Sequence, residues 1–233
     1  MRIAMWSGPR NISTAMMYAF GNRSDFSVWD EPFYAAYLKV SGVDHPLRSE
    51  VVKHHESDPL RVSKACTGSI PDGKQNFYMK HMALHMLDGF ALDWANECVN
   101  VHLIRHPARV IASYAEKRQN PNLRDIGFRE QVQLFRRFPG PVLDSSDIRA
   151  DPEGMLKSLC DAIGLEFDQS MLSWQAGPKP FDGVWASHWY GSVHRSTGFA
   201  GPENKIPLLK GALGKLLEEA LPFYEQLAAF RLQ

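Results

Sequence analysis

Residues 2–20 read RIAMWSGPRNISTAMMYAF, and the expected architecture follows from this segment. It begins with a short apolar run, Ile3 to Trp6, which has the length of a strand that is buried on both faces. A Ser-Gly-Pro turn follows the run. Apolar residues then recur at the spacing of one helix face, at Ile12, Ala15, Met16 and Ala19. We therefore predict a strand, a tight loop and a helix in succession.

The predicted loop suits the binding of an anion. Arg10, Asn11, Ser13 and Thr14 gather at the start of the helix, where free backbone N–H groups and the helix dipole favour phosphate or sulfate. A Walker A loop would add a second glycine and a lysine before the terminal hydroxyls, and both are missing here. Arg10 would supply the cation as a bidentate fork. The alternative is an ordinary connection whose Ser and Asn side chains only cap the helix.

The length and the net charge of the chain limit the number of domains and the kinds of partner that we expect. The chain has 233 residues, which fits one α/β domain over 1–233 or at most two small ones. Its 26 basic and 26 acidic residues cancel, so we expect neither nucleic acid nor a membrane as a partner. Three cysteines without metal-ligand spacing indicate reduced thiols. With no signal peptide and no long apolar run at the start, we expect a cytoplasmic protein.

Polar residues follow four predicted strands. The strands span residues 3–6, 26–29, 76–79 and 99–104, and they are followed by Ser7–Arg10, Asp30-Glu31, Lys80-His81 and Arg105-His106. Strands that alternate with helices predict a largely parallel sheet covered on both faces, and ligands of such sheets bind beyond the carboxyl ends of the strands. We therefore expect a single site at one edge of an α/β sheet.

The rest of the chain is predicted as helices and two long segments. Helical patterns cover residues 33–40, the stretch up to Asn96, 107–117, 127–138, 152–163 and the C-terminal region from Leu209. A short final strand is expected at 141–143. Residues 41–75 are polar and contain several prolines, so we interpret them as an irregular lid or insertion, or else as a solvated surface excursion. Residues 174–207, rich in Gly, Pro, Ser and Trp, predict a long ordered loop.

Two motifs together resemble the sulfotransferase family, a branch of the P-loop nucleotide-binding fold. The first is the run from Pro9 to Thr14. The second is a strand that ends at Arg105, with Ser113 eight residues later on the next helix. The segment 142–164 is similar to the closing strand-to-helix unit of the family. The resemblance covers roughly residues 1 to 170 and implies a three-layer P-loop NTPase-like fold with a mainly parallel sheet between helices.

The resemblance also implies an activity and a donor. The family transfers a sulfuryl group from 3′-phosphoadenosine 5′-phosphosulfate (PAPS) to a hydroxyl or amine of a small metabolite or sugar, leaves adenosine 3′,5′-bisphosphate, and needs no metal. The implied ligands of the 5′-phosphosulfate are Arg10, Asn11, Ile12, Ser13 and Thr14. Arg105 and Ser113 would hold the 3′-phosphate. Arg195 falls where a late basic loop of the family closes over the 3′-phosphate and the adenine.

The acceptor needs a base, and two residues are candidates. Glu31 occupies the place of the glutamate that fills this role in bacterial and carbohydrate branches of the family. Bound anions beside it would raise its pKa towards neutrality. His81 is the rival base, with Lys80 beside it to stabilise the bridging oxygen of the leaving nucleotide. Alternatively, the Asp30-Glu31-Pro32 turn only caps a helix or forms salt bridges.

Two other functions stay open at this point. One is a P-loop kinase that phosphorylates a small molecule with ATP, although the missing Gly-Lys pair argues against it. The other is a non-catalytic nucleotide-binding module of the same fold. The aromatic residues Trp185, Trp189 and Tyr190 would stack on a ligand or belong to the core. The sequence also leaves open whether the chain forms a homodimer.

Overall fold

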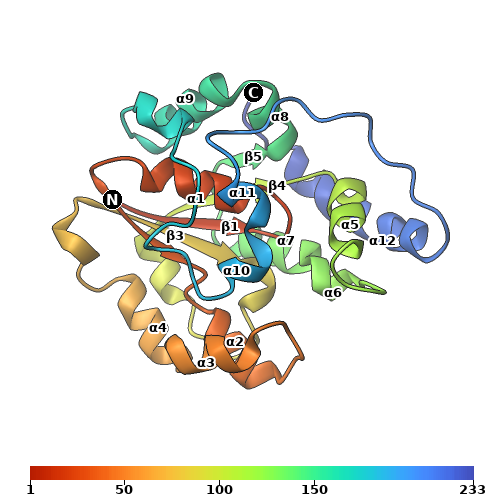
Figure 1. Ribbon diagram of the computed structural model, residues 1–233, viewed down its shortest axis with the longest axis horizontal. Coiled ribbons are helices and arrows are strands. Elements are labelled where there is room, and N and C mark those ends of the chain that lie inside the picture. The colour runs from red at the N-terminus through yellow and green to blue at the C-terminus, as the bar shows by residue number, and fades with distance from the viewer.

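A five-stranded, all-parallel sheet forms the centre of the computed structural model, which describes residues 1–233 (Figure 1). Its strands are β1 (Arg2–Ser7), β2 (Phe26–Asp30), β3 (Asn76–Met82), β4 (Val99–Ile104) and β5 (Val142–Asp144), in the spatial order β2-β3-β1-β4-β5. Every neighbouring pair runs parallel. The carboxyl ends of all the strands therefore share one edge, as the sequence predicts.

Helices cover both faces of the sheet, which makes the three predicted layers. On one face, α1 (Ser13–Gly21) and α9 (Pro152–Ile163) join Ile3 and Met5 of β1 in the largest core cluster. On the other face, Ala4 and Trp6 pack with α4 (Pro59–Cys66) and α7 (Phe128–Arg137). The side chains of β1 thus alternate between two apolar layers, as the strand period requires.

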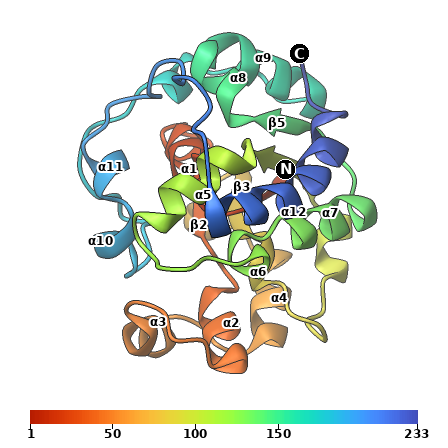
Figure 2. The same ribbon diagram turned by 90° about the vertical axis from the view of Figure 1, so that its right-hand side faces the viewer.

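The remaining helices surround this core. They are α2 (Tyr34–Ser41), α3 (Arg48–His54), α5 (Pro107–Ala115), α6 (Leu123–Ile126), α8 (Ser145–Ala150), α10 (Ala186–Trp189), α11 (Gly191–His194) and α12 (Gly211–Ala228). Short 3₁₀ turns lie at Pro71–Gly73, Ala83–His85, Asp93–Glu97 and Gln169–Leu172. Figure 2 shows α12 beside α5 and α7, which it contacts. None of the helices has the length and apolar composition needed to cross a bilayer.

Three predictions about elements need correction. Residues 41–75 are not irregular: they form α3 and α4, which lie beside α2 at one end of the molecule (Figure 1). Pro59 begins α4 directly after its cap Asp58 and so starts a helix where we expected an interruption. β3 continues to Met82 and contains Lys80 and His81. The stretch up to Asn96 contains only 3₁₀ turns and loops.

Candidate functional site

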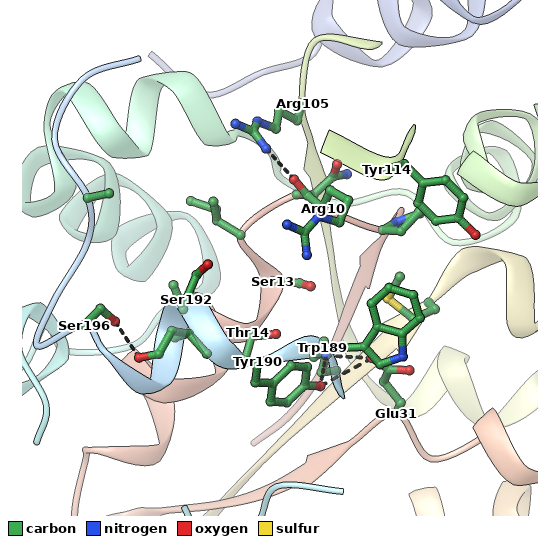
Figure 3. A pocket seen from close by; sticks show the side chains of 18 of the residues that line it. Arg10, Ser13, Thr14, Glu31, Arg105, Tyr114, Trp189, Tyr190, Ser192 and Ser196 are labelled. Atoms are coloured by element: carbon green, nitrogen blue, oxygen red, sulfur yellow. Dashed lines mark hydrogen bonds and ion pairs between the residues drawn. The ribbon is translucent and has the colours of Figure 1, made fainter. Parts of the chain in front are cut away.

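A cavity of about 300 Å³ opens at the carboxyl edge of the sheet (Figure 3). Residues 9–15 form one wall, and the strand ends add Glu31, Lys80 and Arg105. Residues of the late loop between Trp189 and Ala200 form another wall. Arg10 and Arg105 lie at one end of the cavity, Glu31 and Tyr190 lie at the other, and Ser13 and Thr14 lie between them (Figure 3). The structure thus brings residues from four strand ends to a single site.

The loop from Gly8 to Ile12 has an unusual backbone. Arg10 and Ile12 have left-handed conformations, with φ angles of 63° and 57°. Such a conformation is a genuine outlier for a β-branched residue, and strain of about 1–3 kcal/mol per residue is typical of functional loops. A side chain at Gly8 would place its Cβ 2.9 Å from the carbonyl oxygen of Ile126, so this position requires glycine. The loop is therefore held in a strained shape.

This shape leaves the backbone N–H groups at the start of α1 without hydrogen-bond partners in the chain. No side chain caps the helix at Ile12, and the backbone N–H groups of Ser13, Thr14 and Ala15 donate to no group of the chain. Asn11 is buried and fastens the loop, because its Nδ2 donates to the carbonyl of Leu103 at 3.0 Å. The free N–H groups and the positive end of the helix dipole can therefore receive an anion.

Two arginines and a serine connect the loop to β4 and α5. The guanidinium of Arg105 donates to the carbonyl of Arg10 at 2.7 Å, and Nε of Arg10 donates to Oγ of Ser113 at 2.9 Å. Burial, together with the nearby charge of Arg105, lowers the pKa of the Arg10 guanidinium, which nevertheless stays charged at neutral pH. Arg10 and Arg105 line the cavity, whereas Ser113 is not among the lining residues. In this structure Ser113 therefore orients Arg10.

A buried ionic network holds Glu31 at the other end. Nζ of Lys80 donates to Asp30 at 3.0 Å, to Glu31 Oε1 at 2.7 Å and to the hydroxyl of Tyr190 at 2.5 Å. The hydroxyl of Tyr190 in turn donates to Asp30 at 2.8 Å. An ammonium group has three N–H donors, and all three are used here. Lys80 therefore keeps no donor for the bridging oxygen that we predicted as its target, and it acts by holding Glu31.

The environment of Glu31 sets its protonation. Burial raises the pKa of its carboxyl, and the nearby charge of Asp30 adds to the effect, while Lys80 counteracts only part of it. Burial alone would lower the pKa of Lys80, but the charges of Asp30 and Glu31 raise it by more. The pKa of Lys80 is therefore raised, and the residue stays protonated. Oε2 of Glu31 has no hydrogen-bond partner within the chain, and Nδ1 of His85 lies 3.9 Å away. Burial keeps the pKa of His85 well below its usual value, so His85 is neutral. Glu31 thus offers one free carboxylate oxygen.

The structure contradicts His81 as the rival base. Because β3 extends past it, His81 points to the sheet face opposite Lys80 and stacks on Trp6, with ring centroids 4.7 Å apart. Its two ring nitrogens are buried without partners, and burial lowers its pKa to about 3. It does not line the cavity. His81 is a core residue.

The predicted role of Arg195 as a ligand of the 3′-phosphate also does not agree with its position in the structure. Its neighbours Ser192, Val193 and Ser196 line the cavity, so the late loop does cover the site, but Arg195 itself is exposed and does not line it. The cation that sequence reasoning missed is Arg149 on α8. The sequence could have indicated Arg149, because it lies in the helix that directly follows β5, and β5 ends at the same edge of the sheet as the other four strands.

The aromatic residues of the late loop divide between core and cavity. Trp185 is almost fully buried in the core, whereas Trp189 and Tyr190 line the cavity. Tyr34 on α2 and His45 after it complete this wall, and His45 stacks on Trp189 at 5.5 Å. No local motif in the sequence marks Tyr34 or His45 as site residues.

The chain is similar to known proteins in both sequence and structure. The profile of the family described as "Sulfotransferase domain" matches residues 1–231. Two proteins of Arabidopsis thaliana, named branched-chain-amino-acid aminotransferase-like proteins 2 and 1, are 37% identical over 227 residues and 39% identical over 228 residues. Each alignment covers 95% of this chain but only 40% of the relative, so the chain spans about two fifths of their length.

Two solved structures share the fold. The sulfotransferase domain from the curacin biosynthetic pathway has a TM-score of 0.54 at 16% identity, covering 99% of this chain and 98% of that one. The sulfotransferase domain from the Synechococcus PCC 7002 olefin synthase has a TM-score of 0.55 at 16% identity, covering 100% and 96%. The family profile spans nearly the whole chain, and the architecture agrees with it. This chain belongs to the sulfotransferase domain family.

Proposed function

We propose that this protein transfers a sulfuryl group from PAPS to a hydroxyl or amine group of a small molecule. The observation that carries the proposal is the layout of the cavity. Arginines lie at one end, a free helix N-terminus lies in the middle, and a carboxylate with an unpaired oxygen lies at the other end. An anionic donor and a nucleophilic acceptor fit this order.

The residues present fit a donor that carries two anionic groups. The N–H groups and hydroxyls of Ser13 and Thr14, with Arg10, would hold the 5′-phosphosulfate, and Arg105 would hold the 3′-phosphate. Ser113 would act through Arg10, which it orients. When bound, the donor supplies an activated sulfuryl group and a good leaving group. No metal is part of this proposal.

Glu31 would act as the general base for the acceptor. Its Oε1 is fixed by Lys80, so Oε2 is the oxygen that can take the proton of an acceptor hydroxyl. The cavity that Glu31 faces is also lined by Tyr34, Met82, Leu84 and Trp189. They favour an acceptor that carries a flat or apolar group beside its hydroxyl.

Thermal-shift measurements with two ligands test the donor class. We expect adenosine 3′,5′-bisphosphate to raise the melting temperature, while ATP with magnesium has little effect, because a ligand stabilises only a protein that binds it. Arg10→Ala and Arg105→Ala should each abolish the shift. Arg61→Ala, at a side chain that is 74% exposed and does not line the cavity, is the control. Stabilisation by ATP and magnesium alone would instead support a kinase.

Transfer assays separate an enzyme from a binding module. Glu31→Gln should keep the affinity for adenosine 3′,5′-bisphosphate and lose sulfuryl transfer from PAPS to a panel of phenols, aliphatic alcohols and sugars. A wild-type protein that binds the nucleotide but transfers sulfate to none of these acceptors would support the non-catalytic module.

A further inference from the structure

Three arginines converge on one buried carboxylate next to the cavity. The side chain of Glu203 is 3% exposed. Its Oε1 accepts hydrogen bonds from Nε of Arg105 at 3.0 Å and from Nη1 of Arg149 at 2.9 Å. Its Oε2 pairs with Nε of Arg109 at 2.8 Å and accepts from Oγ of Ser146 at 3.3 Å. These partners come from the end of β4 and from α5 and α8.

Glu203 belongs to a segment that has few other attachments to this region. Residues 201–210 contain neither helix nor strand and are mostly exposed. Arg149 donates to the carbonyl of Gly201 at 2.8 Å, and Arg109 donates to the carbonyl of Asn204. The same arginines that bind Glu203 therefore hold the backbone on both sides of it.

The arginine cluster is larger than a carboxylate requires. Glu203 offers two oxygens and one negative charge to three guanidinium groups and a hydroxyl. A phosphate monoester offers three terminal oxygens and nearly two negative charges, and arginine forks match its geometry well. Arg105 and Arg149 also line the cavity, so the cluster continues directly from the space assigned to the donor.

We propose that Glu203 occupies, in the free protein, the anion site that receives the 3′-phosphate of the donor, and that donor binding displaces it. This inference rests on the proposed function. The 3′-phosphate and the carboxylate of Glu203 cannot share the site, because both are negatively charged and would need the same guanidinium groups. Displacement returns Glu203 to water and detaches residues 201–210 from the arginines. Glu203 is then an internal competitor that lowers the apparent affinity for the donor.

Calorimetric titration with two nucleotides tests the competition. Adenosine 3′,5′-bisphosphate and adenosine 5′-monophosphate differ only in the 3′-phosphate, so only the first should meet Glu203. We expect Glu203→Gln to tighten binding of the bisphosphate by at least about tenfold, which corresponds to about 1.4 kcal/mol, and to leave the monophosphate within about twofold. Glu219→Gln, the same change at an exposed position of α12, should alter neither.

Each of the other outcomes would contradict either the role inferred for Glu203 or the proposed function. If Glu203→Gln binds the bisphosphate no better than the wild type, Glu203 is a structural ion-pair partner. If it tightens both nucleotides equally, the effect is general electrostatics. If neither protein binds the bisphosphate at all, it is the proposed function that fails.

Limited trypsin digestion of the wild-type protein tests displacement without any substitution. Lys205 and Lys210 are exposed cleavage sites within the segment. The bisphosphate should speed cleavage at these lysines, whereas the monophosphate should not. Equal cleavage rates with both nucleotides would show that the segment stays attached, and would overturn the displacement.

Discussion

At the scale of single residues, Glu31 makes the proposed reaction depend on pH. Only its carboxylate form can accept a proton, and burial raises the pKa of this group. As the pH falls through the raised pKa, the carboxylate takes up a proton and kcat falls. We expect this acidic limb to lie above the value of about 4.3 that an ordinary glutamate shows. A kcat that stays constant down to that pH would contradict the role of Glu31 as the base.

For His81 we expect a substitution to leave both activity and stability nearly unchanged. His81→Leu removes two ring nitrogens that have no partner and keeps a side chain of similar volume. We expect the free energy of unfolding to change by less than about 1.5 kcal/mol, because no hydrogen bond is lost. Sulfuryl transfer should keep its kcat within about twofold, since the side chain of His81 does not line the cavity and cannot contact a bound substrate. A large loss of kcat with intact nucleotide binding would restore His81 as a catalytic residue.

At the scale of elements, the loop between β1 and α1 depends on Gly8. Gly8→Ala would push its Cβ against the carbonyl oxygen of Ile126. Because backbone must move to relieve the contact, we expect a loss of about 1–3 kcal/mol in the free energy of unfolding and weaker binding of adenosine 3′,5′-bisphosphate. Chemical denaturation and calorimetry measure the two effects. Gly201→Ala, where a Cβ meets no atom within 4 Å, is the control for stability. Equal stabilities of the two variants would contradict the close approach at Gly8.

The short helix α10 contributes to the acceptor end of the cavity. Trp189 lines the cavity, whereas the adjacent His188 is exposed. Trp189→Ala should raise the KM for an aromatic acceptor by roughly tenfold, the effect of about 1.4 kcal/mol, with little change in kcat. His188→Ala should change neither constant. A loss of nucleotide affinity in Trp189→Ala would instead place this residue against the donor.

The elements also show why part of the site could not be read from the sequence. The strands were predictable because their apolar runs are continuous, and so the edge where Arg10, Glu31 and Arg105 meet was predictable too. The end of β3 was not, because Lys80 is a buried cation whose partner Asp30 lies on the neighbouring strand. Arg195 looked like a ligand by position. Its side chain direction depends on the packing of the late loop, which has no local signal.

At the scale of the whole molecule, a net charge of zero conceals a strongly basic site. Arg10, Arg105, Arg109 and Arg149 gather around one end of the cavity, and Glu203 neutralises only one of these charges. Raising the salt concentration from 0.1 M to 1 M shortens the screening length from about 10 Å to about 3 Å. We expect adenosine 3′,5′-bisphosphate to lose more affinity over this range than adenosine 5′-monophosphate. Equal salt dependence in calorimetric titrations would contradict a separate basic site for the 3′-phosphate.

The central position of β1 has a consequence for synthesis of the chain. β1 is made before both of its partners, β3 at residues 76–82 and β4 at residues 99–104. Contacts between such distant segments form slowly and only after the intervening chain exists. β1 therefore has no partner strand until residue 82 has left the ribosome, and it lacks its second partner until residue 104 has done so. During that interval the nascent chain is open to aggregation and to chaperones.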